Sequence, residues 1–167
     1  MKKSTILLLI VVYIVSFFVI GLLGHSIRNY NPEIYPESIE VMDPDNKTTM
    51  SRDVKDETTG ELLYHYYFVY RNYKYGDSVR IKAIVKPDKC TYPNVDFLKE
   101  NSDTSFKIET HETNPNIEQN FALITLNDVL DADNPILTTA FSITSTNPGS
   151  RIVLKIGVTF VSSELGI

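Results

Sequence analysis

The chain has 167 residues, 43% of them hydrophobic and 22% charged, which suits one compact domain with a tail and is too little for two full domains. Sixteen basic residues against 21 acidic ones give a formal net charge of −5, and this balance argues against a protein that binds a phosphate backbone. The single cysteine excludes an intrachain disulfide framework and a multi-cysteine zinc or iron–sulfur site.

An uncharged apolar run from Ser4 to Gly24 follows two lysines at the N-terminus. As a helix its 21 residues would be about 31 Å long, which matches a hydrocarbon core of about 30 Å. Because basic residues are retained in the cytoplasm, this run predicts a single-pass signal anchor in the cell membrane, with a cytoplasmic N-terminus and an extracellular C-terminal domain. The alternative is a secretory signal cleaved near Gly24, although its apolar run is unusually long and Leu22 stands where a small residue is preferred.

Beyond the apolar run, the sequence alternates between apolar and polar residues in short stretches bounded by turn residues, which is typical of half-buried strands. The clearest stretch is Ser78–Lys86, flanked by Gly76-Asp77 and Pro87-Asp88. The other predicted strands are Ser38–Met42, Leu62–Tyr70, Ser105–Thr110, Phe121–Leu126, Leu137–Thr144 and Arg151–Val161. About seven such strands predict an all-β fold, an antiparallel β-sandwich. The polar segment Asp43–Gly60 is expected to be a long exposed loop or a hairpin tip.

One part of the sequence resembles a known family. Gly76-Asp77-Ser78-Val79 opens an alternating strand that closes on Val85-Lys86-Pro87-Asp88, and Asn94-Val95-Asp96-Phe97 follows a few residues later. This pattern resembles the bacterial immunoglobulin-like domain of the second group, found in invasin- and intimin-type surface proteins, although Phe97 stands where that family usually has Trp. The resemblance covers about 22 residues. It implies an Ig-like sandwich and a surface-displayed module for adhesion, spacing or contact with protein or carbohydrate, without catalysis.

These observations predict the following organisation: residues 1–3 a cytoplasmic N-terminus, 4–24 a transmembrane helix, 25–37 a polar stalk, and 38–167 an Ig-like β-sandwich ectodomain.

An aromatic cluster is the first candidate site. Seven aromatic residues fall within 12 positions: Tyr64, Tyr66, Tyr67, Phe68, Tyr70, Tyr73 and Tyr75. Tyrosine offers a large rigid area and a hydroxyl, so the six tyrosines are candidates for a surface that binds sugar rings or a protein partner. The alternative is a strand with one face in the core and tyrosine hydroxyls that reach water, since tyrosine is favoured in strands.

An acidic cluster is the second candidate site. Its members, Asp128, Asp131, Asp133 and Asn134, offer the oxygen ligands that calcium prefers. The cluster does not fit an EF-hand loop, because Ile136 and Ser142 stand where glycine and glutamate are needed. Solvated turn residues are the alternative. A second acidic group, Asp43-Pro44-Asp45-Asn46, is a weaker candidate.

No catalytic motif is visible in the sequence. The three histidines are scattered, and neither a nucleophile elbow nor a phosphate-binding glycine loop is present. Cys90 lies between two predicted strands, where it is expected to be a buried thiol, with an exposed or intermolecularly paired thiol as the alternative. We therefore expect no enzymatic activity and no resident cofactor, with calcium as the one candidate ligand.

The functional hypothesis is a membrane-anchored bacterial cell-surface protein whose Ig-like domain binds or spaces partners in adhesion or in the envelope. Its expected partners are the membrane, through the N-terminal helix, and an unidentified surface protein or glycan, whereas its acidic charge argues against nucleic acid. The alternative hypothesis is a secreted or anchored calcium-dependent carbohydrate-binding module, or an accessory domain of an exported enzyme.

Overall fold

The computed structural model describes residues 3–28, 32–100, 104–147, 149 and 152–162, and within the N-terminal helix it describes the side chains of residues 10–23. The chain divides into two compact units, Met1–Glu33 and Ile34–Ile167. We call them the helical unit and the β unit, and describe each by itself.

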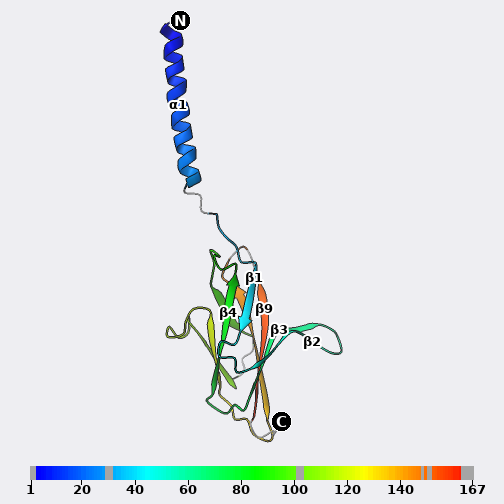
Figure 1. Cartoon of the computed structure of the whole chain (residues 1–167). Coiled ribbons are helices and arrows are strands. Elements are labelled where there is room, and N and C mark those ends of the chain that lie inside the picture. Colours follow the sequence, from blue (N-terminus) through cyan, green and yellow to red (C-terminus); the bar gives the residue numbers. More distant parts are fainter. Residues whose placement is uncertain (1–2, 29–31, 101–103, 148, 150–151, 163–167) are drawn as a thin grey trace. The chain divides into compact units, whose positions relative to one another are not determined.

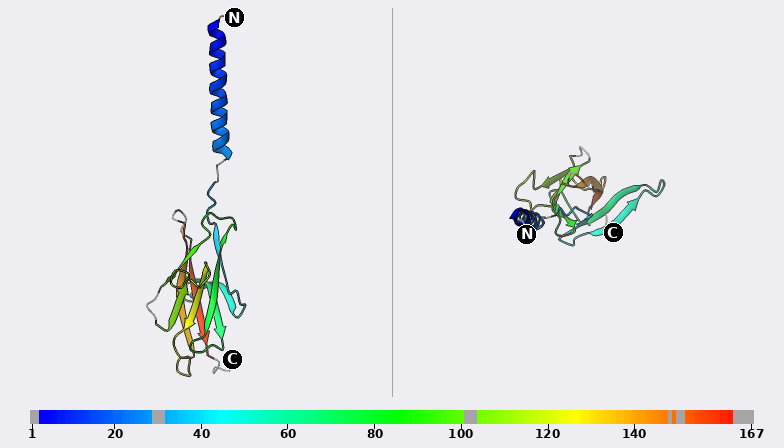
Figure 2. Two further views of the ribbon diagram at one scale, coloured as in Figure 1. Left: turned by 90° about the vertical axis from the view of Figure 1, so that its left-hand side faces the viewer. Right: turned by 90° about the horizontal axis from the view of Figure 1, so that it is seen from above.

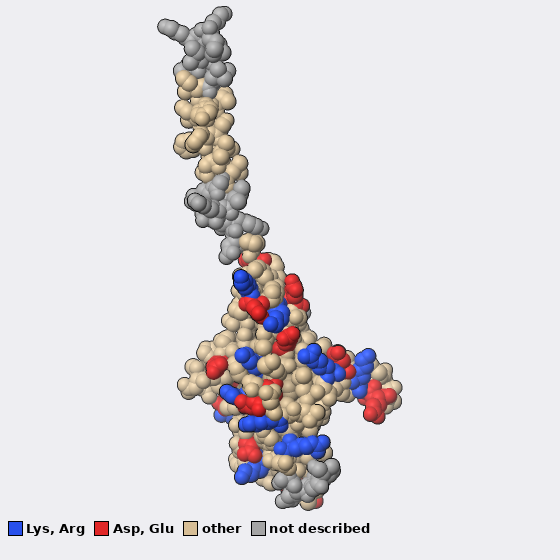
Figure 3. Space-filling view, in the orientation of Figure 1, with Lys and Arg blue, Asp and Glu red and all other residues tan. Residues whose placement is uncertain are grey.

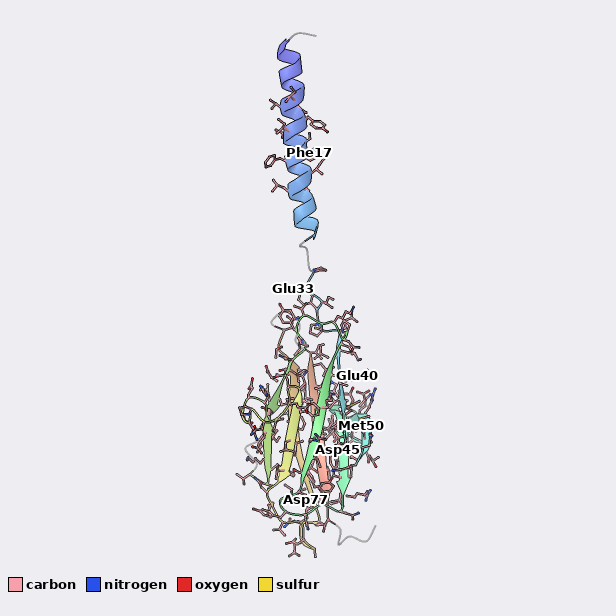
Figure 4. The ribbon with its side chains drawn as sticks, turned by 60° about the vertical axis from the view of Figure 1, so that its left-hand side comes forward. Phe17, Glu33, Glu40, Asp45, Met50 and Asp77 are labelled. Atoms are coloured by element: carbon pink, nitrogen blue, oxygen red, sulfur yellow. The ribbon has the colours of Figure 1, made fainter. Side chains whose placement is uncertain are left out.

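The helical unit contains one helix, α1 (Lys3–Arg28), which includes the whole uncharged run predicted to be a membrane anchor. Its described side chains are exposed: Phe17, labelled in Figure 4, is 70% exposed. Figure 3 shows this stretch without a charged side chain. Within the part of the chain that the structure describes, no helix combines the length and the apolar character needed to cross a membrane.

The β unit consists of two sheets that share one core (Figure 1). The four-stranded sheet has the order β1-β4-β7-β6, and the five-stranded sheet has the order β2-β3-β9-β8-β5. The strands are β1 (Ser38–Met42), β2 (Thr49–Lys55), β3 (Leu62–Arg71), β4 (Ser78–Lys86), β5 (Val95–Lys99), β6 (Phe106–Thr110), β7 (Phe121–Leu126), β8 (Ile136–Ser145) and β9 (Val153–Val161).

The core forms because alternate residues of each strand point to the same side of its sheet. In β4 this alternation buries Val79, Ile81, Ala83 and Val85, as the sequence predicted. The largest fully buried side chains from the opposite sheet are Phe68, Tyr70, Phe141 and Phe160. Figure 2 shows the two layers from two further directions. Phe97 is half-buried and packs against this core, with 6.1 Å between its ring centroid and that of Phe141.

The predicted all-β fold is confirmed, with two corrections. Nine strands are described rather than about seven, since β2 and β5 join the seven that alternation alone predicted. The fold is also not purely antiparallel, because β3 runs parallel to β9 from the pair Tyr66–Ile156 to the pair Arg71–Val161. Alternation predicts that a segment is a strand, but it does not say which strand is its neighbour or in which direction the two run.

The segment Asp43–Gly60, expected to be a loop or a hairpin tip, contains β2. This strand pairs with β3 in an antiparallel hairpin that extends away from the rest of the β unit (Figures 1 and 2). None of its residues is buried. Alternation could not reveal a strand that has no buried face, so the sequence showed only its polarity. Charges of both signs gather at the tip of the hairpin (Figure 3).

The chain enters the β unit at the end that carries the β4–β5 loop. The backbone N–H of Ile34 donates to the Thr91 hydroxyl at 2.8 Å, and the N–H of Thr91 donates to the Ile34 carbonyl at 2.8 Å. The rings of Tyr35 and Tyr92 stack with centroids 6.2 Å apart. The last residues of the predicted stalk therefore belong to the β unit, and residues 29–31 of that stalk lie outside the described residues.

Candidate functional site

Strand β3 separates the predicted tyrosine surface into an inner and an outer set. Tyr66 and Tyr70 lie in the core, 8% and 0% exposed. The Tyr70 ring stacks on Phe160 at 5.7 Å, and the half-buried Tyr73 meets both rings edge-on. The assignment of Tyr66 and Tyr70 to an exposed recognition surface is therefore wrong, because alternation along β3 turns both side chains toward the opposite sheet.

The buried Tyr70 hydroxyl lies close enough to the acidic group Asp43-Pro44-Asp45-Asn46 to be affected by its charge. Burial is the main cause that raises the pKa of Tyr70, and the nearby Asp43 carboxylate adds to it. Among the described residues this hydroxyl has no hydrogen-bond partner of good geometry. Asp43 is itself buried and accepts the backbone N–H groups of Asp45 and Lys47 at 2.8 and 2.7 Å. Asp43 thus holds its own turn together, a structural role.

The outer face of β3 carries a pair of stacked tyrosines, Tyr64 and Tyr67, which we call the outer tyrosine pair. Their ring centroids are 5.4 Å apart and their planes are inclined by 24°. Both rings lie against Gly157 of β9: a Cβ added to that residue would be 2.6 Å from Tyr67 Cδ2 and 3.0 Å from Tyr64 Cδ1. A glycine inside a strand marks a place where another group approaches the backbone closely, and here that group is the outer tyrosine pair.

Hydroxyl groups of three neighbouring strands form a chain beside the outer tyrosine pair. The Tyr67 hydroxyl and Thr159 Oγ1 hydrogen-bond at 2.6 Å, and Thr159 Oγ1 and Thr138 Oγ1 hydrogen-bond at 2.7 Å. Further along the same face, the Ser142 hydroxyl donates to the Glu100 carboxylate. Thr138 is exposed, so the chain of hydroxyls runs from the tyrosine ring to solvent.

The pKa of Tyr64 responds to its surroundings on this face, including the charge of Glu100. Partial burial is the first cause that raises the pKa of Tyr64, followed by the neighbouring Tyr67 and then by the negative charge of Glu100. Since its ordinary pKa is 10.0, the Tyr64 hydroxyl is protonated at neutral pH and can donate a hydrogen bond. The outer tyrosine pair and the residues beside it therefore offer two aromatic rings, several neutral hydroxyls and one carboxylate.

The remaining member of the predicted tyrosine surface, Tyr75, is 63% exposed and lies in the β3–β4 connection. No ring of another described aromatic residue stacks on it, unlike the rings of Tyr64, Tyr67, Tyr70 and Tyr73. Of the six predicted tyrosines, the structure thus brings only Tyr64 and Tyr67 together on an outer surface.

The predicted calcium ligands lie in the exposed β7–β8 connection. One Asp131 oxygen accepts the backbone N–H groups of Asp133 and Asn134 at 3.0 and 2.8 Å, which is a turn of the kind that aspartate often makes. Asp128 accepts hydrogen bonds from the N–H of Val129 and from the Ser105 hydroxyl. Over the described residues, no three or more His, Cys, Asp or Glu side chains gather closely enough to hold a metal ion.

Cys90 is a buried free thiol, as expected from the sequence. Its Sγ lies 3.2 Å from the carbonyl oxygen of Ile34 and accepts the backbone N–H of Tyr92 at 3.3 Å. This thiol therefore helps to attach the entering segment to the β4–β5 loop.

Sequence reasoning missed five residues that lie beside the outer tyrosine pair: Glu100, Thr138, Ser142, Gly157 and Thr159. The available signal was Gly157, a glycine between Ile156 and Val158 in the interior of a predicted strand. The hydroxyl and carboxylate groups carried no signal of their own, because they come from strands whose neighbours were unknown.

Comparisons with protein-family models, with curated proteins and with solved structures find no match to this chain.

Proposed function

We propose that this chain is a membrane-anchored bacterial surface protein whose β unit is an Ig-like, non-catalytic domain for binding or spacing partners outside the cell. The observation that carries the proposal is the strand order of the two sheets. An immunoglobulin constant domain has strands A, B, E and D in one sheet and G, F and C in the other.

The β unit follows the same pattern when its strands are taken in chain order. The order β1-β4-β7-β6 corresponds to A-B-E-D, and β9-β8-β5 corresponds to G-F-C. In this correspondence β2 and β3 form an inserted hairpin, whose second strand adds to the sheet beside β9. This order supports the relationship to bacterial immunoglobulin-like domains that the Gly76–Phe97 resemblance suggested, because strand order is independent of those residues.

The membrane anchor is supported by the sequence of α1. The uncharged run Ser4–Gly24 is 21 residues long and lies within one helix. Its described side chains, most of them apolar, are exposed. Exposed apolar side chains along a helix are stable in lipid and costly in water. Lys2 and Lys3 favour a cytoplasmic N-terminus, which would place the β unit outside the cell.

The proposal is tested by the topology of the full chain carrying a C-terminal tag. We expect its intact mass in the membrane fraction of expressing cells, and we expect protease added to intact cells to remove the tag. A matched control places the same tag at the N-terminus, where it should be protected. A soluble protein with a protected C-terminal tag would contradict the proposal. A species in the medium that begins near His25 would replace the anchor by a cleaved signal and leave the exported Ig-like domain in place.

A further inference from the structure

We propose that residues 34–36, where the chain enters the β unit, form a strap that opens and closes while both sheets stay folded. We call this segment the entry strap; the residue before it, Glu33, is labelled in Figure 4. Its opening exposes the Cys90 thiol and lengthens the connection between the two units. The opening follows from contacts within the β unit alone, and its use as an adjustable tether rests on the proposed function, in which α1 holds the chain in a membrane.

The contacts that close the entry strap join it to the β4–β5 loop. The N–H of Ile34 donates to the Thr91 hydroxyl and the N–H of Thr91 donates to the Ile34 carbonyl, both at 2.8 Å. The rings of Tyr35 and Tyr92 stack with their planes inclined by 19°, and the Cys90 thiol donates to the Ile34 carbonyl at 3.2 Å. Because all these contacts join two short adjacent stretches of chain, they break together when the strap moves away.

Pro36 separates the entry strap from β1. A proline has no backbone N–H, so the hydrogen-bond ladder between β1 and β4 cannot continue through it. On the other side of Pro36, the N–H of Glu37 donates to the Lys86 carbonyl at 2.8 Å, next to the first β1–β4 pair, Ser38 with Lys86. The backbone of the strap can therefore move without breaking a hydrogen bond of the β1–β4 ladder.

Burial also differs between the entry strap and β1. In the strap only Pro36 is buried, whereas Ile34 is 38% and Tyr35 51% exposed. In β1, Ile39 and Val41 point into the core and are 4% and 2% exposed. Opening the strap thus exposes little apolar surface, while release of β1 would expose part of the core. A segment with little buried apolar surface and with hydrogen bonds near solvent is of the kind that opens locally.

The β4–β5 loop keeps its place when the strap leaves, because other contacts hold its far end. The Asn120 side chain donates to the Pro93 carbonyl at 2.7 Å and accepts the N–H of Val95 at 3.0 Å. The N–H of Thr146 donates to the Asn94 carbonyl at 3.2 Å. The strap is therefore the part that moves, and the loop is the surface that it leaves.

Opening has two consequences. The Cys90 thiol is 9% exposed under the closed strap, and departure of the Ile34 carbonyl uncovers it. Three residues of extended chain span about 10 Å, so the connection gains up to that length while the sheets stay intact. Since the strap precedes β1 in the chain, a load on the connection acts on the strap before it acts on β1.

The test uses the full chain, labelled with ¹⁵N, in detergent micelles and at urea concentrations below the unfolding transition. We expect the Thr91 amide, whose hydrogen bond ends on the strap, to exchange with solvent at least about tenfold faster than the Val158 amide in the centre of β9. The Thr91 rate should also depend much less on urea, because little surface is exposed when the strap opens. Cys90 is the single cysteine, so its labelling by a thiol reagent, followed by mass, reports the same opening.

Two variants loosen the strap. Tyr35→Ala removes one ring of the stack, and Thr91→Val removes the hydroxyl that accepts the Ile34 N–H. Each should raise the Cys90 labelling rate about two- to tenfold, with a nearly unchanged melting midpoint. The matched control is Tyr75→Ala, an exposed tyrosine in the β3–β4 connection, which should be labelled as slowly as the unaltered chain. The urea dependence in the unaltered chain provides the comparison if a variant does not fold.

The inference is overturned if the Thr91 and Val158 amides exchange at the same rate and with the same urea dependence, because the strap would then open only with the whole β unit. Equal labelling rates for Tyr35→Ala and Tyr75→Ala would also overturn it. The topology experiment does not depend on the strap. A chain confined to the cytoplasm would refute the proposed function and leave the opening of the strap standing, whereas a displayed chain whose strap opens only on global unfolding would refute this inference alone.

Discussion

Replacement of Gly157 by alanine tests whether the outer tyrosine pair depends on close approach to the sheet. The added Cβ would lie 2.6 Å from Tyr67 Cδ2, about 1 Å inside ordinary van der Waals contact. Ring carbons of a stacked pair cannot retreat like the end of a flexible side chain, so the Tyr67 ring must tilt away. Overpacking of this kind typically costs about 1–3 kcal/mol.

Two further effects act in opposite directions. Tilting the ring weakens the hydrogen bond between the Tyr67 hydroxyl and Thr159, which is worth about 1 kcal/mol. Alanine in place of glycine inside a strand gains about 0.5–1 kcal/mol, since the unfolded chain then has less conformational freedom. We therefore expect Gly157→Ala to lower the free energy of unfolding by about 1–3 kcal/mol.

The assay is thermal unfolding of the full chain, followed by far-ultraviolet circular dichroism at a β-sheet wavelength. At about 4 °C per kcal/mol for a domain of this size, the midpoint should fall by about 4–12 °C. Gly149→Ala is the matched control: its added Cβ would meet Asn147 Oδ1 at 3.5 Å, an ordinary contact, so its midpoint should stay the same or rise. In the double variant Gly157→Ala/Tyr67→Leu, removal of the ring should recover part of the loss. A Gly157→Ala protein as stable as the unaltered chain would refute the close packing on which this reasoning depends.

Two other predictions concern Asp45 and Cys90. The Arg80 side chain, which donates hydrogen bonds to the Asp45 carboxylate, lowers the pKa of that group below its ordinary value of 3.8. Its contribution to stability is therefore fully present above that value and lost as the pH falls below it, so Asp45→Asn should flatten the decline of the melting temperature below about pH 4. Parallel declines in the two proteins would contradict this. The Cys90 thiol, 9% exposed, should react with a disulfide reagent far more slowly in the folded chain than in denaturant, and equal rates would place it on the surface.

The sequence predicted the strands that have a buried face and their inward residues. Ser38–Met42, Ser78–Lys86 and Phe121–Leu126 were predicted with the bounds that the structure has. In the first two strands apolar and polar positions alternate with few interruptions, whereas Phe121–Leu126 is a short, almost wholly apolar run. The strand β2 could not be predicted in this way, since all of its residues face solvent at least in part. Alternation of apolar and polar residues arises where one face of a strand is buried. A strand held only by backbone pairing to its neighbour therefore need not show it.

The candidate site shows a different limit of sequence reasoning. The sequence identified Tyr64 and Tyr67 as members of a cluster. It could not separate them from Tyr66 and Tyr70, which are also tyrosines and lie on the same strand. Alternation along β3 would group Tyr64 with Tyr66 and Tyr70, whereas the structure stacks the Tyr64 ring on Tyr67 against Gly157. The partners Thr138 and Thr159 lie far along the chain, and the pairing of β3, β9 and β8 brings them to the same face. Glu100 directly follows β5 and reaches this face because β5 pairs with β8.

The hairpin of β2 and β3 explains why the outer tyrosine pair lies within a sheet and not at its edge. Without β2, strand β3 would be the border of the five-stranded sheet, and the tyrosine rings would have support on one side. The strand β2 takes that border position, and it carries the features that discourage further strand pairing: Arg52, Asp53 and Lys55 are charged, and the register shifts between Val54 and Lys55. Asp53 also has a φ of 50°, in the left-handed region, which disturbs the regular edge. The strand β2 thus extends the sheet beyond β3, and its charges and irregular register discourage pairing with a further strand. The outer tyrosine pair therefore has a neighbouring strand on both sides of β3.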